Sequence, residues 1–269
     1  MNKELVRQLK NVEKEEAKFL NKKENRFMKN RIDPLTDQLL QKIPKKLTYT
    51  LESAFVKSFQ LLYEKGDGLI GRTFNKDQRQ MDHKILSYAL DQDSNRRYIK
   101  QMDKQVQQSK LLNTSFSVLE GGVLGFLGIG LPDIPVFIGV VLRNVYEVAL
   151  SYGYDFDSAE EKFYILGLID AAMSQGVRKV RHNERLDVLG GYLDEGRPLK
   201  FDMKRQMDIT AKTLADAMLV AKFIQGIPVV GTVGGVVNYN IIRKISQYAA
   251  IKYKKRYLLS KFQKSSTQT

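Results

Sequence analysis

The residues with the clearest chemical potential lie in one largely apolar run near the middle of the chain. The run carries Asp133, Arg143 and Glu147, and it closes with Tyr152 and Asp155. Arg143 and Glu147 are four residues apart, so a helix places them on the same face. A buried arginine needs an acidic partner, because an unpaired buried charge strongly destabilises a fold. These five residues are therefore predicted to form a polar cluster that binds a ligand or fixes the position of a buried helix.

Three interpretations of this cluster differ in the chemistry they predict. Asp133 stands directly before an isoleucine and a proline, where a helix N-cap belongs, and Arg143 then forms a structural salt bridge with Glu147, Asp155 or Asp157. Alternatively, apolar helices enclose a lipid or acyl chain whose anionic head meets Arg143. A third hypothesis is an enzyme in which Asp133, Glu147 and Asp155 form a carboxylate site.

Several common kinds of catalytic and cofactor site are not indicated by the sequence. The chain has no cysteine, which excludes disulfides and thiolate catalysis, and its two histidines, His83 and His182, have no partner at metal-ligand spacing. No phosphate-binding glycine loop or nucleophile elbow occurs. We therefore expect no metal and no cofactor, and nothing in the sequence identifies an enzyme.

The positive charge is concentrated at the two ends of the chain. The net charge is +14, and residues 217–269 contain nine Lys or Arg and no Asp or Glu. Such an asymmetry favours an anionic partner, either a membrane surface or nucleic acid. Nucleic acid is disfavoured because no nucleic-acid-binding motif accompanies the charge. The candidate membrane-surface residues are Lys244, Lys252, Lys254, Lys255 and Arg256; the alternative is an ordinary solvated helix face.

Two uncharged or nearly uncharged stretches, 121–142 and 223–242, are long enough to cross a bilayer. Asp133 and several prolines interrupt them, and a broken helix exposed to lipid leaves backbone groups unsatisfied. Each stretch is better explained as a pair of short apolar helices that meet at a Gly/Pro turn. Such hairpins could lie in the protein core or insert shallowly into a membrane interface.

The rest of the pattern predicts an all-α, multi-helix bundle with basic terminal helices. Residues 1–47 form a charged N-terminal helical arm, residues 48–262 the main helical domain, and residues 263–269 a disordered tail. Met81, Ile85, Leu86 and Tyr88 supply the inner face of one helix. Ser158 and Glu161 have the spacing of a capping box, and a Gly-rich turn follows in LGGYLDEGRP.

The central run LPDIPVFIGVVLRNVYEVALSYGYD resembles the hallmark of the EcsC protein family. The matching residues are Asp133, Pro135, Arg143, Glu147, Tyr152, Gly153 and Asp155. A second block, IPVVGTVGGVVNYNIIRKISQYAAIKYKKRYL, also resembles the family at Gly226, Pro228, Gly231, Gly234, Asn238 and Arg256.

The resemblance covers about residues 50–262 and assigns no reaction. It implies a helical domain with membrane-proximal character, because the family is named for a protein encoded beside two components of an ABC exporter. It also implies that Asp133, Arg143, Glu147 and Asp155 matter to the family. Together with the charge pattern, it predicts a non-enzymatic cytoplasmic protein at the inner face of the cell membrane, with anionic lipid and ABC exporter subunits as partners.

Overall fold

The computed structural model describes residues 3–21, 43–66, 70–71, 73–93, 95–110, 133–224 and 235–267. Every regular element in these ranges is a helix, which confirms the predicted all-α class. The elements are α1 (Lys3–Asn21), α3 (Lys45–Leu61), the π-helix η1 (Leu62–Gly66), α5 (Lys76–Gln92), α6 (Arg96–Lys110), α8 (Asp133–Ser151), α9 (Ala159–Met173), α10 (Gly176–Asp194), α11 (Met203–Ile224) and α12 (Gly235–Thr267).

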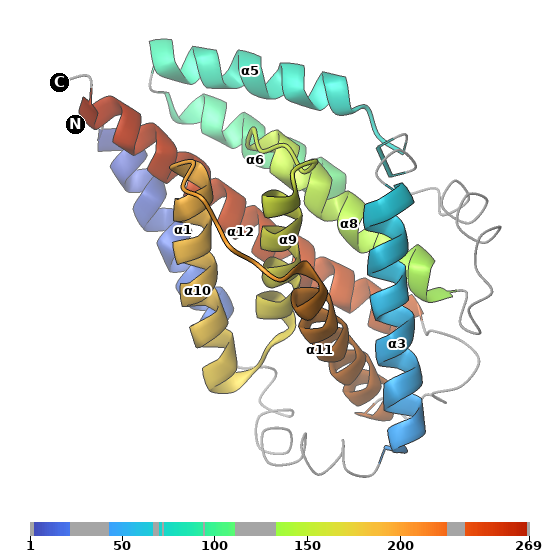
Figure 1. Ribbon diagram of the computed structural model, residues 1–269. Helices are drawn as coiled ribbons and strands as arrows, with labels where there is room; N and C mark the ends of the chain where they lie inside the picture. Colours follow the sequence, from blue (N-terminus) through green and yellow to red (C-terminus); the bar gives the residue numbers. More distant parts are fainter. Residues whose placement is uncertain are drawn as a thin grey trace.

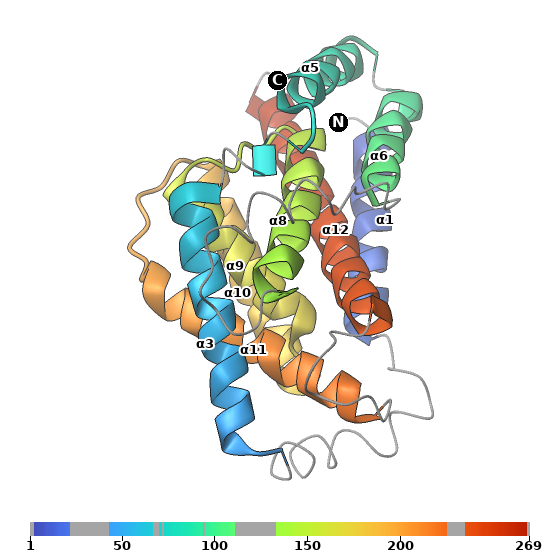
Figure 2. The same cartoon turned by 90° about the vertical axis from the view of Figure 1, so that its right-hand side faces the viewer.

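Helix α12 runs through the middle of the bundle and contacts helices from both halves of the chain (Figures 1 and 2). It packs against α1, α8 and α9, and along part of its length against α6, α10 and α11. Between Ile251 and Leu258 all but one of its residues are buried, so this segment has no solvent face. Charged residues on the segment are therefore carried into the protein interior.

Helix α8 is the apolar core of the fold. The segment Ile134–Ser151 is long and apolar enough to span a membrane, but 94% of it is buried inside the protein. Its apolar residues contact α3, α5, α6 and α12. The helix thus occupies the position of a core helix, as one of the two alternatives for this stretch predicts. The Gly/Pro turns of both predicted hairpins fall in 111–132 and 225–234, which lie outside the described residues.

Helix α1 packs lengthwise on α12 rather than standing apart from the bundle (Figure 1). The apolar residues of its buried face are Leu5, Val12 and Phe19. The ring of Phe19 stacks on Tyr248 of α12, with 4.8 Å between the centroids. At its C-terminal end, α12 continues to Thr267, whereas residues 263–269 were predicted to form a disordered tail.

The predicted inner face of helix α5 is wrong except at Leu86, which is half-buried and packs against the core. Met81, Ile85 and Tyr88 are exposed instead of facing the core, whereas Leu90 is buried. The reason lies on the other side of the helix, where Arg79 and His83 bond to groups on α6 and α8. Polar contacts, which helical periodicity does not register, fix the rotation of this helix.

Candidate functional site around helix α12

Arg256 on α12 is a buried cation that contacts two carboxylates and several aromatic rings. Its guanidinium binds both oxygens of Glu161 on α9, at 2.8 and 3.2 Å, and Asp194 at the end of α10, at 2.6 Å. The rings of Tyr154 and Tyr164 lie 4.2 and 4.3 Å from the guanidinium carbon. This arrangement satisfies a buried charge by bidentate pairing and by contact with aromatic faces.

A helical glycine makes room for Arg256. A Cβ at Gly190 would lie 3.1 Å from Cδ of Arg256 and 3.3 Å from the ring of Tyr164. The turn predicted in LGGYLDEGRP forms at Gly196, where φ is 65°, whereas Gly190 lies inside α10, which continues to Asp194. The small size of Gly190 allows α10 to approach α12 closely.

Two lysines of α12 share two carboxylates in a second cluster. Lys252 donates to Glu16 of α1 at 2.7 Å, and it also pairs with Asp187 of α10. Lys255 contacts the same two acids at 2.6 and 2.9 Å. Burial disfavours the charge of Lys255, but its bonds to Glu16 and Asp187 outweigh this and hold its pKa above the ordinary value. The cluster joins α1, α10 and α12.

These contacts correct the predicted role of the basic C-terminal residues. Lys252 is 1% exposed, Lys254 and Arg256 are also buried, and Lys255 is largely enclosed. All four are paired with acids contributed by other helices, so in this fold they present no charge to a membrane surface and form no solvated helix face. Lys244, the fifth candidate, is half-buried.

Arg143 binds Glu147 within α8, with 3.0 Å between Nε and Oε1. The second oxygen of Glu147 accepts from Arg79 of α5, also at 3.0 Å, and Arg79 donates in addition to the carbonyl of Gln105 on α6. Glu147 is thus the acid among the three candidates that meets Arg143. Because both of its oxygens are used, the trio ties α5 and α6 to the core helix.

The remaining candidates of the predicted polar cluster lie elsewhere. Tyr152 donates to Asp103 of α6 at 2.8 Å, and Asp155 binds Lys76 at 3.2 Å. The side chain of Asp133 lies outside the described residues, although α8 begins at this position. Glu147 and Asp155 therefore bind different cations, and the structure gives no support for a joint carboxylate site.

Sequence reasoning assigned Glu161 to a capping box, and only half of that box forms. The hydroxyl of Ser158 accepts from the backbone N–H of Glu161 at 3.1 Å, as predicted. The Glu161 carboxylate instead turns inward, where it binds Arg256 and accepts from the hydroxyl of Tyr253 at 2.7 Å. The acids that pair with Lys252, Lys254, Lys255 and Arg256 come from four other helices, and no local spacing marks them.

The two histidines are half-buried rather than surface residues. Nδ1 of His182 lies 2.8 Å from Asp170, whose other oxygen accepts from Thr213 at 2.7 Å. His83 lies against the ring of Tyr257, with its Nδ1 3.2 Å from the carbonyl of Ser151. Among the described residues, no group of three or more His, Asp or Glu is arranged for a metal ion.

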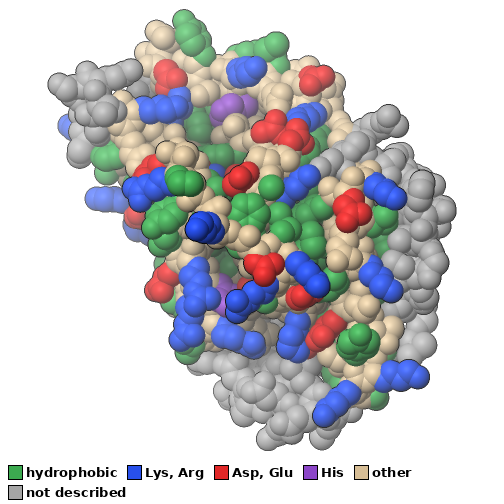
Figure 3. All heavy atoms as spheres, viewed as in Figure 1, with side chains coloured by type: hydrophobic (Ala, Val, Ile, Leu, Met, Phe, Trp, Pro, Cys, Tyr) green, Lys and Arg blue, Asp and Glu red, His purple; other side chains and the backbone are tan. Residues whose placement is uncertain are grey.

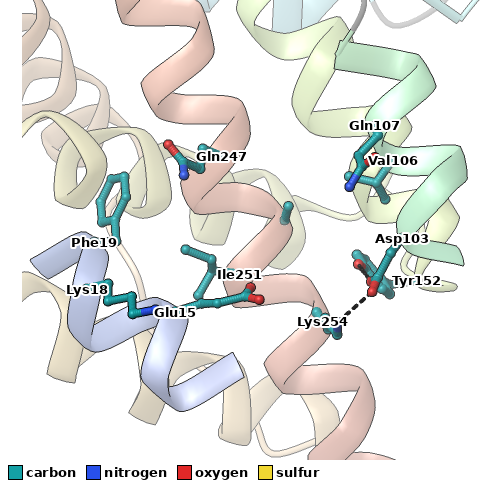
Figure 4. Close-up of a pocket in the computed structure, with 11 residues that line it drawn as sticks. Glu15, Lys18, Phe19, Asp103, Val106, Gln107, Tyr152, Gln247, Ile251 and Lys254 are labelled. Atoms are coloured by element: carbon teal, nitrogen blue, oxygen red, sulfur yellow. Dashed lines mark hydrogen bonds and ion pairs between the residues drawn. The ribbon is translucent and has the colours of Figure 1, made fainter. Parts of the chain in front are cut away.

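A cleft of about 560 Å³ opens between α1, α6 and α12 (Figure 4). Glu15 and Lys18 lie on its α1 wall, and Asp103, Tyr152 and Lys254 meet on the opposite side. Lys254 donates to Asp103 at 2.7 Å, on the oxygen that Tyr152 does not use. Burial, and then the charge of Asp103, raise the pKa of Tyr152 well above its usual value, so the phenol stays neutral.

Arg143 is not among the residues that line this cleft. Its guanidinium binds Glu147, and an apolar pocket headed by Arg143 stays a prediction. The cleft walls carry charges of both signs, together with polar and apolar side chains. The cleft therefore presents polar and apolar surface together.

The fold and its charged interior define an all-α bundle organised around one long helix with buried cations. Residues 6–258 match the sequence model of the EcsC protein family, and the chain belongs to this family. The match begins within α1, so the N-terminal helix, placed outside the resemblance by the sequence reasoning, is part of the family region.

A full-length relative supports the same assignment. The Bacillus subtilis (strain 168) protein described as "Uncharacterized protein YdbA" is 23% identical over 274 residues, which cover 98% of this chain and 97% of the relative. No solved structure matches the chain.

Proposed function

We propose that this protein binds peripherally to an anionic membrane surface through the outer face of α10. The observation that carries the proposal is the composition of that face. Arg178, Arg181 and Arg185 are exposed along it, together with one acid, Glu184. The apolar side chains of Val177, Val180, Val188 and Tyr192 are exposed between and beyond the arginines.

This face combines the two features of an interfacial helix. Arginines attract anionic head groups, while exposed valines and a tyrosine insert at the boundary between head groups and acyl chains. Figure 3 shows Lys and Arg side chains gathered over α10 and the adjoining part of α11, with hydrophobic side chains beside them. Because Lys252, Lys254, Lys255 and Arg256 are internally paired, the proposal places lipid contact on α10 instead of on this segment of α12.

Co-sedimentation with vesicles tests the proposal. The wild-type protein is expected to pellet with phosphatidylcholine vesicles that contain phosphatidylglycerol, and to remain in solution with pure phosphatidylcholine. Replacing Arg178, Arg181 and Arg185 with Gln removes about 1 kcal/mol per residue. The partition coefficient should therefore fall roughly a hundredfold.

A matched control changes the same net charge on another helix. Arg96, Arg97 and Lys100 are exposed on α6, and their replacement with Gln should leave vesicle binding within about twofold of wild type. Equal losses in both triple variants would show a general charge effect and would contradict a specific α10 surface. Binding to DNA or RNA without binding to anionic vesicles would also overturn the proposal.

The family resemblance adds subunits of an ABC exporter as a partner class. Co-purification of the tagged protein with exporter subunits from the membrane fraction tests this part separately. Loss of the exporter association with retained vesicle binding would leave the α10 proposal standing.

A further inference from the structure

We infer that the cleft between α1, α6 and α12 binds a small zwitterion that carries a primary ammonium and an acid group, such as a free amino acid. The inference rests on the side chains that face the cleft and does not depend on membrane binding. It concerns a different surface from the outer face of α10.

The α1 wall offers two exposed side chains of opposite charge. Glu15 and Lys18 are three residues apart on the helix and therefore neighbours on its surface. Within the described residues, neither side chain makes a hydrogen bond or an ion pair. In Figure 4 the carboxylate of Glu15 points into the cleft. A ligand ammonium can meet Glu15 while its acid group meets Lys18.

The opposite wall is pre-organised in a different way. Asp103 holds Lys254 at 2.7 Å and accepts from Tyr152 at 2.8 Å, so the position of the ammonium is fixed before any ligand arrives. Lys254 uses one N–H in this pair and has two more to donate. The side-chain amides of Gln107 on α6 and Gln247 on α12 also line the cleft and offer both donors and acceptors.

The sum of these charges decides the ligand class. Two carboxylates and two ammonium groups line the cleft, so its net charge is zero. A ligand with a large net charge leaves an uncompensated partner in the cleft, whereas a zwitterion supplies both signs together. Ala250 and Ile251 form an apolar floor that suits a short aliphatic side chain, and about 560 Å³ is ample for an amino acid.

Matched compounds test the contributions of the ammonium and the carboxylate of the ligand separately. Isothermal titration of the full chain with leucine, N-acetylleucine and leucinamide compares the zwitterion with forms that lack the ammonium or the carboxylate. Leucine should bind saturably, and each blocked form should bind about tenfold or more weakly. Glycerophosphoethanolamine carries the same two groups, and tests whether the zwitterion is a lipid head group rather than a free amino acid.

A pair of variants on α1 locates the binding site. Glu15→Gln should weaken binding of the zwitterion about tenfold or more, because it removes a charge-assisted hydrogen bond. Glu13→Gln makes the same charge change at another exposed position of α1. Because Glu13 does not line the cleft, this variant should bind the zwitterion with wild-type affinity. The inference is overturned if neither zwitterion binds up to about 10 mM, if N-acetylleucine binds as tightly as leucine, or if the two variants behave alike.

Discussion

Replacing Arg256 with Met should be among the most damaging single changes in this chain. The substitution keeps much of the side-chain volume but leaves Glu161 and Asp194 without their common cation. The Glu161 side chain is 8% exposed, and Arg256 supplies both of its ion-pair contacts, at 2.8 and 3.2 Å. Removing one partner of a buried ion pair costs about 3–5 kcal/mol. That is a large fraction of a total stability of about 5–15 kcal/mol.

Urea unfolding followed by helical circular dichroism measures this loss, and Lys252→Met is the internal comparison. Lys255 still contacts both Glu16 and Asp187 when Lys252 is absent, so the loss there should be clearly smaller. Adding Glu161→Gln to Arg256→Met should recover part of the stability, because the stranded charge is gone. A loss below about 1 kcal/mol for Arg256→Met, or a larger loss for Lys252→Met, would refute the reasoning.

Two further predictions concern the contact between Gly153 and His83. Gly153 has φ of 85°, and a Cβ there would overlap the His83 ring, so Gly153→Ala should cost about 2–4 kcal/mol in the same unfolding assay; an unchanged midpoint would contradict this. Burial lowers the pKa of His83 below its ordinary value of 6.5, so the unfolded chain takes up the proton at a higher pH than the folded chain does. The contribution of His83 is therefore complete above about pH 6.5 and declines as the pH falls from there toward the folded-state pKa. The difference in unfolding free energy between about pH 7.5 and about pH 5.5 should shrink in His83→Asn, and an unchanged difference would show that His83 does not contribute.

Local patterns predicted the parts of this structure that depend on neighbours in sequence. The helical class follows from the spacing of apolar residues, and the Arg143–Glu147 pair follows from a four-residue separation within one helix. The hydroxyl half of the Ser158 cap also forms as predicted. In each case the interacting groups lie within one helical turn, so the sequence contains both partners side by side.

The roles of the basic residues of α12 could not be predicted in this way. Glu16 and Lys252 are separated by 236 residues, and the pairing of Glu161 with Arg256 spans 95. A run of Lys and Arg on a helix is usually solvated, and only the packing of α1, α9 and α10 around α12 makes this one internal. The tyrosines that flank the three cations in YKKRY are a local sign of such burial, because an aromatic ring can cover a neighbouring cation, as Tyr253 does for Arg256.

A single tryptophan placed on α10 gives the most direct test of the proposed membrane surface. The chain has no natural tryptophan, so Val188→Trp on the exposed face of α10 reports from one position, and Ile85→Trp reports from the exposed apolar face of α5. On addition of anionic vesicles, the emission of the α10 probe should shift to the blue while that of the α5 probe stays unchanged. A shift confined to the α5 probe, or no shift at either position, would contradict membrane binding through α10.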